Sequence, residues 1–273
     1  MISALNEVSD LDIPVLQPYR TLKGQKSHRD QGVFVAEGEL VVRRLLESAL
    51  TVSSVLLTPA WFENYRARLD ERAESIEVFI APQPVLVKIV GYAFHRGIMA
   101  LAKVPKPLSL DQAVSCAGQP GLIVALDNIG SAENLGVIAR NCAACGVDAI
   151  IVGQGCADPY LRRAVRNSMG TVFRLPIVRA DDLADTLQML RSRHGFRVLA
   201  AHPQPGSMAI QQADLQDNCC IILGHEGSGI SPAIVSTADL CVRVPMASGI
   251  DSFNVACAGA AILYEIRRQR GFQ

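Results

Sequence analysis

The sequence lacks an excess of charge of either sign. Lys and Arg number 26, Asp and Glu also number 26, and the formal net charge at pH 7 is zero. Proteins that bind nucleic acid usually carry a basic footprint, so any such site here has to be local. Two groups of basic residues meet that requirement: Arg20, Lys23, Lys26, His28 and Arg29 near the start, and Arg162, Arg163 and Arg166 in the middle. Scattered solvated charge explains either group equally well on its own.

Aromatic residues and long apolar runs are also scarce. Aromatic residues make up only 5% of the chain, whereas 49% of its residues are hydrophobic. The core is therefore expected to consist of Val, Ile, Leu and Ala, which suits buried parallel strands. No apolar stretch is long enough to span a membrane, and no signal peptide is recognisable. We expect a cytoplasmic protein that does not contact a membrane.

The eight cysteines lack the spacing of a metal or redox site. Cys142-Ala-Ala-Cys145 is a lone CxxC pair without the second pair that zinc requires. It also lies inside a helical pattern, whereas a redox pair belongs at the start of a helix. Reduced thiols that fill the core are the simplest account of the cysteines, and we expect no bound metal.

The common nucleotide and hydrolase motifs are missing as well. Gly130, Gly136 and Gly153-Gln-Gly155 do not form the G-x-G-x-x-G that follows the first strand of a dinucleotide-binding fold. The phosphate loop GxxxxGK[ST] is absent, and no Ser, His and Asp stand in the context of a nucleophile elbow. These absences argue against a nucleotide-dependent oxidoreductase, an NTPase and a serine hydrolase.

Prolines divide the chain into two patterns. Residues 1–15 have no strong period and are interpreted as an arm, and residues 16–104 as a small mixed α/β domain. Lys103-Val-Pro105-Lys-Pro107 favours an extended segment, so we place a linker at 105–120. In the first domain we expect strands near 34–36, 52–57, 78–80 and 98–102 and helices near 40–46 and 86–90.

From residue 121 onward, strands and helices alternate. We expect strands at 122–126, 149–152, 175–178, 198–201, 220–223 and 240–244. The expected helices are 135–145, 159–167, one that begins at Asp181 or Asp182, and 254–270. Such alternation predicts a parallel sheet with helices on both faces, and we expect this domain to span residues 121–273.

Three polar motifs follow strands of this predicted sheet. They are Asn134-Leu-Gly136-Val-Ile-Ala-Arg140, Leu223-Gly224-His225-Glu226-Gly227-Ser-Gly229, and the segment from Val244-Pro245-Met246 through Gly249 to Ser252-Phe253-Asn254-Val255. The carboxyl ends of parallel strands are where open α/β sheets bind ligands. We therefore expect the three motifs to form one site.

Each motif also has a simpler interpretation. Asn134 and Arg140, six residues apart, are expected on roughly one face of a helix, where the arginine can bind a phosphate or an oxyanion; a capping Asn and a surface Arg are as good an account. Glu226 is the carboxylate of the second motif and can accept a proton, whereas His225 is interpreted as a polar loop residue. Ser252 and Asn254 suit a helix N-cap and equally a site for an anion.

Taken together and in this order, the motifs resemble those of the SpoU/TrmH family of RNA ribose 2′-O-methyltransferases, which belongs to the SPOUT superfamily. The resemblance covers roughly residues 120–270, and Ala164-Val-Arg166-Asn-Ser168-Met169-Gly170 is similar to a further family segment. Phe34-Val-Ala-Glu37-Gly38 and Arg96-Gly97-Ile-Met-Ala resemble the RNA-substrate-binding domain that precedes the catalytic domain in this family.

The resemblance implies a trefoil-knotted α/β domain whose knot binds S-adenosylmethionine, and a homodimer. It implies a catalytic set of Arg140, Asn134, Glu226, Ser252 and Asn254. The implied cofactor contacts are Gly224, Val244, Met246, Gly249 and Phe253, and the implied RNA contacts are Arg20, Lys23, Arg29 and Arg166. Family proposals make Arg140 the base. Because a guanidinium group keeps its proton near neutral pH, stabilisation of the developing alkoxide is the easier role to defend.

The sequence departs from the family pattern at two positions. Asn141 follows Arg140 where Ser or Thr is usual, and Phe253 stands where Leu is usual. Neither change removes a group that the mechanism requires. The small residues Ala256, Ala258, Gly259, Ala260 and Ala261 of the last helix suit either a close subunit interface or burial within one subunit.

Our leading hypothesis is a methyltransferase that acts on a ribose 2′-hydroxyl. The N-terminal RNA-binding unit favours ribosomal RNA over transfer RNA. A catalytically silent RNA-binding or ribosome-assembly protein on the same fold is the alternative, and binding of the cofactor without methyl transfer would support it.

Overall fold

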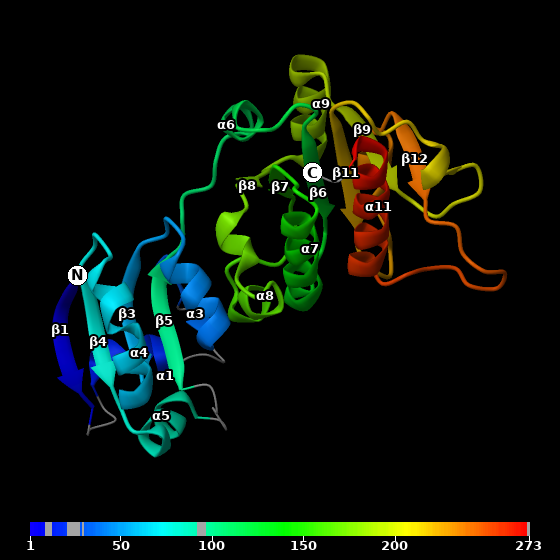
Figure 1. Ribbon diagram of the computed structural model, residues 1–273. Helices are drawn as coiled ribbons and strands as arrows, with labels where there is room; N and C mark the ends of the chain where they lie inside the picture. Colours follow the sequence, from blue (N-terminus) through cyan, green and yellow to red (C-terminus); the bar gives the residue numbers. More distant parts are fainter. Residues whose placement is uncertain (9–12, 21–27, 29, 92–96, 272–273) are drawn as a thin grey trace. The chain divides into compact units, whose positions relative to one another are not determined.

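The computed structural model describes all of the chain except residues 9–12, 21–27, 29, 92–96 and 272–273 (Figure 1). Its contacts divide the chain into two units. Unit 1 comprises residues 1–105 and 160–173, and unit 2 comprises residues 106–159 and 174–273. Each unit has its own sheet.

Unit 1 is built on a mixed five-stranded sheet in the order β1-β4-β3-β5-β2. Its strands are β1 (Ile2–Glu7), β2 (Val33–Glu37), β3 (Val52–Leu57), β4 (Ile76–Ile80) and β5 (Ile98–Lys103). Its helices are η1 (Pro14–Leu16), α1 (Gln17–Arg20), α3 (Glu39–Leu46), α4 (Pro59–Asp70), α5 (Gln83–Val90) and α8 (Arg162–Asn167). The neighbours of β5 run antiparallel to it, and the remaining pairs are parallel.

The N-terminal residues differ from the expected arm. Ile2–Glu7 form β1, an edge strand that pairs in parallel with β4. Most of its side chains are exposed, so the strand carries no apolar alternation that a sequence pattern can reveal. The strand is held by its backbone hydrogen bonds to β4, which do not require a buried face of side chains.

Residues 160–173 lie within the range expected for the second domain, yet they pack in unit 1. The Phe34 ring lies 5.2 Å from that of Tyr160 and 5.5 Å from that of Phe173, measured between centroids. Arg162 Nε donates to Glu37 Oε2 at 2.7 Å, with both side chains largely buried. This packing joins residues that are far apart along the chain, so the alternation of strands and helices cannot reveal it.

Unit 2 is built on a seven-stranded sheet in the order β10-β12-β9-β11-β6-β7-β8, and all its strand pairs are parallel. Its strands are β6 (Leu122–Asp127), β7 (Ala149–Val152), β8 (Ile177–Arg179), β9 (Arg197–Ala201), β10 (Met208–Ala209), β11 (Cys219–Gly224) and β12 (Leu240–Arg243). The expected parallel sheet is confirmed, and every predicted strand of this region is present.

Helices cover both faces of this sheet (Figure 1). They are α6 (Leu110–Ser115), α7 (Ala132–Ala144), α9 (Leu183–His194), α10 (Pro232–Val235) and α11 (Val255–Arg270), with 3-10 turns η2 (Thr171–Arg174), at the edge of unit 1, and η3 (Ile210–Gln212). One face packs against α6, α9 and α10 in a single apolar cluster. The other is covered by α7 and α11, which pack against each other.

Local sequence explains where these helices begin. Asp182 caps α9 by accepting from the amide of Asp185, as one of the two alternatives predicted, and Ser109 and Gln112 form a capping box at α6. The predicted helix 159–167 begins later, at Arg162. Within the described ranges no helix has the length and apolar character needed to cross a membrane.

Candidate active site

The first motif lies between β6 and the start of α7. Ser131 is the N-cap of α7, because its Oγ accepts from the amide of Asn134 at 3.2 Å. Asn134 therefore lies in the first turn, and its side chain is free of the capping role. Six residues advance an α-helix by about 600°, so Arg140 points about 120° away from Asn134 and not along the same face. Arg140 is exposed.

The second motif is a loop that closes on itself after β11. The backbone amides of His225 and Gly229 each donate to the other residue's carbonyl, at 3.0 and 2.8 Å. Nδ1 of His225 accepts from the amides of Gly227 and Ser228 at 3.0 and 3.1 Å, which agrees with its interpretation as a loop residue. A Cβ on Gly224 would lie 2.5 Å from the amide nitrogen of Ile230, so only glycine allows this close approach of the backbone.

The third motif leads from β12 into α11. Asn254 is the N-cap of α11, and its Oδ1 accepts from the amides of Ala256 at 3.0 Å and Cys257 at 3.4 Å. Ser252 lies two residues before the cap and is exposed. Of the two cap candidates in the sequence, Asn254 alone takes the role.

One side-chain amide connects the three motifs. Nδ2 of Asn254 donates to Oδ1 of Asn134 at 3.2 Å and also to Oε1 of Glu226. Asn134, Glu226 and Asn254 thus come together, as expected from their positions after parallel strands. Among the described residues, Arg140 has no hydrogen bond or ion pair with another side chain, which leaves its guanidinium group available to a ligand.

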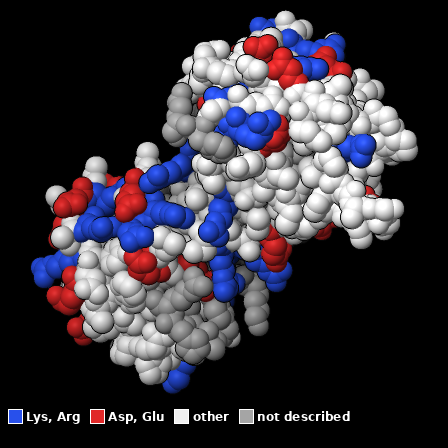
Figure 2. Space-filling model, turned by 45° about the vertical axis from the view of Figure 1, so that its right-hand side comes forward, with Lys and Arg blue, Asp and Glu red and all other residues white. Residues whose placement is uncertain are grey.

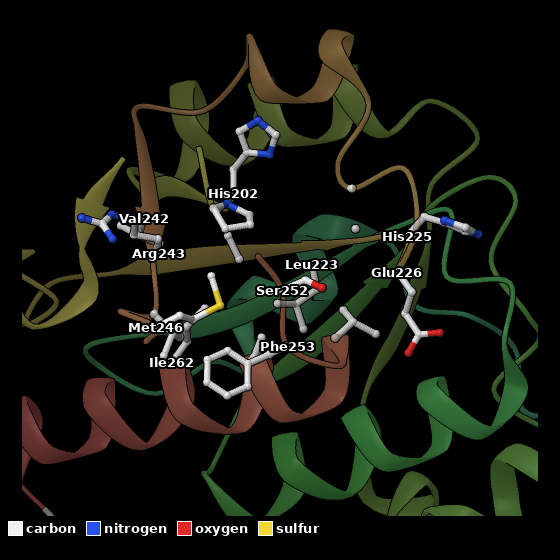
Figure 3. Close-up of a pocket in the computed structure, with 17 residues that line it drawn as sticks. His202, Leu223, His225, Glu226, Val242, Arg243, Met246, Ser252, Phe253 and Ile262 are labelled. Atoms are coloured by element: carbon white, nitrogen blue, oxygen red, sulfur yellow. The ribbon is translucent and has the colours of Figure 1, made fainter. Parts of the chain in front are cut away.

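A pocket that is open to solvent lies beside this cluster (Figure 3). Four of the five expected cofactor contacts line it, namely Gly224, Val244, Met246 and Phe253, together with Glu226 and Ser252. Gly249 is not part of the lining; it is exposed with φ of +83° and turns the chain. Phe253 is 48% exposed, so a bound molecule has apolar surface left to cover.

Sequence reasoning missed several pocket residues. His202 follows β9 and lines the pocket, as do Leu223, Val242, Arg243, Val255, Ala258 and Ile262. For His202 a signal existed, because the predicted strand 198–201 ends directly before it, at the edge where the motifs lie. The apolar residues carry no such signal, since they are also what any buried strand or helix contains.

Hydrogen bonds outside the three motifs hold the loops around the pocket in place. Oδ2 of Asp127, at the end of β6, accepts from the amide of Ser231 at 2.6 Å. The Cys156 thiol donates to the carbonyl of Leu126 at 3.3 Å and accepts from the amide of Ile129 at 3.2 Å. Burial raises the pKa of this thiol, so the thiol stays protonated and can donate to the carbonyl of Leu126.

The arrangement combines a mainly apolar pocket with an adjoining polar cluster and an exposed arginine. Amide and guanidinium donors at the edge of an apolar pocket are suited to stabilise negative charge that develops on an oxygen. The described residues contain no group of three or more His, Cys, Asp or Glu side chains placed to hold a metal ion.

Comparison with known proteins finds a family model that matches just over half of the chain. Residues 121–264 match the model of the SpoU rRNA methylase family. The chain belongs to the SpoU rRNA methylase family. The matched SpoU region begins one residue before β6 and extends into α11, so it includes all three motifs.

Relatives extend the match over the whole chain. A Mycobacterium tuberculosis protein named as an uncharacterized tRNA/rRNA methyltransferase is 35% identical over 97% of this chain and 92% of its own. The 23S rRNA (guanosine-2′-O-)-methyltransferase RlmB of Acinetobacter baylyi is 31% identical over 71% of this chain and 79% of its own. The AdoMet-bound rRNA methyltransferase of Sinorhizobium meliloti is similar in structure, with a TM-score of 0.81 at 26% identity, covering 97% of this chain and 98% of that one.

Two of the four RNA-binding candidates, Arg20 and Arg166, can be placed in the structure, and neither lines the pocket. Arg20 ends α1 and Arg166 is exposed on α8, so both belong to unit 1. Lys23 and Arg29 lie outside the described residues. Figure 2 shows Lys and Arg side chains gathered in local groups with Asp and Glu among them, on a surface that is otherwise mostly uncharged. The zero net charge thus coexists with local basic patches.

Proposed function

We propose that this protein transfers a methyl group from S-adenosylmethionine to a ribose 2′-hydroxyl of RNA. The observation that carries the proposal is the amide of Asn254, which joins Asn134 and Glu226 beside a pocket lined by apolar side chains. Membership of the SpoU family supports the reaction class. The AdoMet-bound structural relative from Sinorhizobium meliloti supports the cofactor.

The pocket residues fit S-adenosylmethionine. Gly224 lines the pocket at the end of β11, and Val244, Met246 and Phe253 offer apolar surface to the adenine of the cofactor. The buried Nδ1 of His202 has no hydrogen-bond partner among the described residues. When bound, the cofactor supplies an electrophilic methyl group on a positively charged sulfur. The knotted path of the chain and a contact from Gly249 remain predictions from the resemblance.

Arg140 is assigned the role of stabilising the 2′-oxygen of the ribose, which attacks the methyl group. Its guanidinium group keeps its proton, so it stabilises the negative charge that develops on the ribose oxygen as the hydroxyl proton leaves. An adjoining phosphate of the RNA offers the same guanidinium a second partner. Arg140 is exposed on α7, which is what access to a macromolecular substrate requires.

The remaining polar groups are assigned to positioning. Glu226 and Asn134 fix the amide of Asn254 from two sides, and Asn254 in turn fixes the start of α11. Ser252, on the wall of the pocket, is assigned to positioning the ribose of the RNA. Because Asn134 and Arg140 share α7, a fixed Asn134 also sets the position of the arginine.

Ribosomal RNA is the proposed substrate, with transfer RNA as the alternative. The Acinetobacter baylyi relative is named as acting on the guanosine 2′-oxygen of 23S rRNA. Unit 1 carries Arg20 and Arg166, which offer RNA contacts in addition to those of the unit that holds the pocket. We place the reaction in the cytoplasm.

We also propose a homodimer. Part of the small-residue stripe of α11 is used within the chain, because Ala256 and Gly259 are buried there. Ala261 and Tyr264 remain exposed on the same helix, and the Tyr264 side chain is 58% exposed. Light scattering of the purified protein at several concentrations tests this, with Tyr264→Arg expected to shift the mass toward the monomer.

The deciding experiment is transfer of a labelled methyl group from S-adenosylmethionine to RNA that lacks the modification. We expect alkali-resistant label in one ribosomal RNA. In Arg140→Ala the rate of labelling is expected to fall at least a hundredfold, because a donor to the developing oxyanion is removed. Cofactor affinity of Arg140→Ala, measured by calorimetry, is expected to stay unchanged because Arg140 does not line the pocket. Cofactor binding without transfer to free or ribosome-bound RNA would instead indicate the silent RNA-binding protein.

A further inference from the structure

His202 stands at the end of β9 with its backbone fully engaged. Its amide donates to the carbonyl of Val242 at 2.9 Å, and its own carbonyl accepts from the amide of Gln204 at 2.9 Å and from Oγ of Ser207 at 2.6 Å. These bonds fix the Cα of His202 between β12 and the following turn. The side chain, in contrast, lines the pocket (Figure 3).

The two histidines of the pocket differ in one respect. Nδ1 of His225 accepts from two backbone amides. Nδ1 of His202 is shielded from solvent and has no hydrogen-bond partner. Among the described residues it is the one buried side-chain nitrogen or oxygen in this position. A buried polar atom left without a partner destabilises a fold by about 1–3 kcal/mol. Nδ1 lies close to the loop at Gly229, since a Cβ on that glycine would be 4.0 Å from it, so a ligand satisfies this atom by entering between the imidazole and the loop.

The strand order places His202 away from the reacting end of the site. β9 lies between β12 and β11, whereas β6, which leads into α7, pairs with the opposite edge of β11. Asn134 and Arg140 are therefore on the far side of β11 from His202. A cofactor whose methyl group faces α7 has its nonreacting portion near His202.

We propose that Nδ1 of His202 forms a hydrogen bond with a ribose hydroxyl of the adenosyl portion of S-adenosylmethionine. The inference rests on the proposed function and deepens it. A hydroxyl group both donates and accepts, so it satisfies Nδ1 in either neutral tautomer of the imidazole. His202 is thus a cofactor-binding residue outside the three motifs, and it contributes to affinity without taking part in methyl transfer.

Three substitutions separate this role from a structural one. His202→Leu removes the polar atom, His202→Asn keeps a polar atom near the position of Nδ1, and His202→Gln places its amide farther out, near the position of Nε2. For S-adenosylhomocysteine, we expect the dissociation constant from calorimetry to rise about tenfold in His202→Leu, the loss of one hydrogen bond. We expect it to rise similarly in His202→Gln and to stay within about threefold of wild type in His202→Asn.

Thermal unfolding of the unliganded protein supplies the second measurement. His202→Leu is expected to have a Tm equal to or above that of wild type, because the buried atom without a partner is gone. His225→Leu is the matched control on the same pocket, and its Tm is expected to fall because two backbone amides lose their acceptor. A fall in Tm for His202→Leu with an unchanged dissociation constant would make His202 structural and overturn the proposal.

A ligand without the amino-acid portion locates the contact. Methylthioadenosine shares the adenosyl group, so His202→Leu is expected to weaken its binding by the same factor as the binding of S-adenosylhomocysteine. A loss confined to S-adenosylhomocysteine would place the contact on the amino-acid portion and overturn the assignment to the ribose. If wild type binds none of these ligands, the proposed function itself fails and this inference falls with it. Binding by wild type with an unaffected His202→Leu refutes the role of His202 alone.

Discussion

Asn254 uses both ends of its side-chain amide. The oxygen caps α11 by accepting from Ala256 and Cys257, and the nitrogen donates to Asn134 and Glu226. The same residue therefore fixes a helix and joins the three motifs. Aspartate caps as well as asparagine does, but it has no hydrogen to donate when ionised, so substitution can separate the two roles.

We predict that Asn254→Asp and Asn254→Ala affect stability differently and activity alike. Asn254→Ala loses the cap and about 1 kcal/mol of the free energy of unfolding. Asn254→Asp keeps the cap, and a carboxylate at a helix N-terminus is favourable. Its repulsion from Glu226 is weakened by solvent because the pair is exposed, so Asn254→Asp is expected to unfold at a higher urea concentration than Asn254→Ala. Both lack the donor, and the methyl-transfer rate of both should fall tenfold or more. Full activity in Asn254→Asp would show that the donor has no part in the reaction.

Residue identities were easier to predict than residue partners. Asn134, Glu226 and Asn254 could be expected in one place, since each follows a strand of a parallel sheet. That a single amide joins them depends on side-chain directions that no spacing reveals. The same limit explains the error over Asn134 and Arg140, which are close along α7 but point to different sides.

At the scale of the element, two glycines show how tightly β11 is enclosed. A Cβ on Gly224 would meet backbone atoms, namely the amide nitrogen of Ile230 at 2.5 Å and the carbonyl carbon of Gly229 at 2.6 Å. A Cβ on Gly259, in α11, would meet Cδ1 of Leu223 at 2.9 Å. The first contact cannot relax without moving the loop, whereas the second can relax by a rotation of the leucine.

We therefore predict a strong asymmetry between Gly224→Ala and Gly259→Ala. Gly224→Ala is expected to cost about 2 to 3 kcal/mol of unfolding free energy through overpacking and to abolish cofactor binding. In Gly259→Ala the helix gains up to about 1 kcal/mol from the better propensity of alanine, which offsets the contact with Leu223. Urea unfolding of both variants decides this, and an equal loss in the two would contradict the geometry.

Element prediction succeeded where burial left a pattern. The central strands of unit 2, β6, β7 and β11, are continuous apolar runs that are buried along their whole length, and they were predicted. The two-residue edge strand β10 was not predicted. The helix α4 was missed although Phe62, Tyr65 and Leu69 form its buried face, since its aromatic and charged composition masks the period. Short elements such as α6 and α10 carry too few residues to show one.

At the scale of the whole molecule, residues distant in sequence hold unit 1 together. Glu37, in β2, pairs with Arg162, in α8, and the side chains are 4% and 17% exposed. The two residues are 125 positions apart. Removal of one partner leaves a buried charge alone, which is more costly than removal of both.

We predict that Arg162→Met lowers the unfolding free energy by about 3 kcal/mol. Glu37→Gln combined with Arg162→Met is expected to recover part of that loss, because no buried charge remains. Chemical denaturation of the two single variants and the double variant measures the coupling. Additive losses, without recovery in the double variant, would show that the pair contributes no coupling energy.

The order of the strands also has a consequence for how the chain is made. Leu122 of β6 pairs with Cys219 of β11, so the ribosome has to add almost a hundred further residues before β6 acquires its second neighbour. Until then the nascent chain displays one unpaired edge of an apolar parallel strand, a template for misassociation. A chaperone that shields the growing chain during this interval would be most needed between the synthesis of β8 and that of β11.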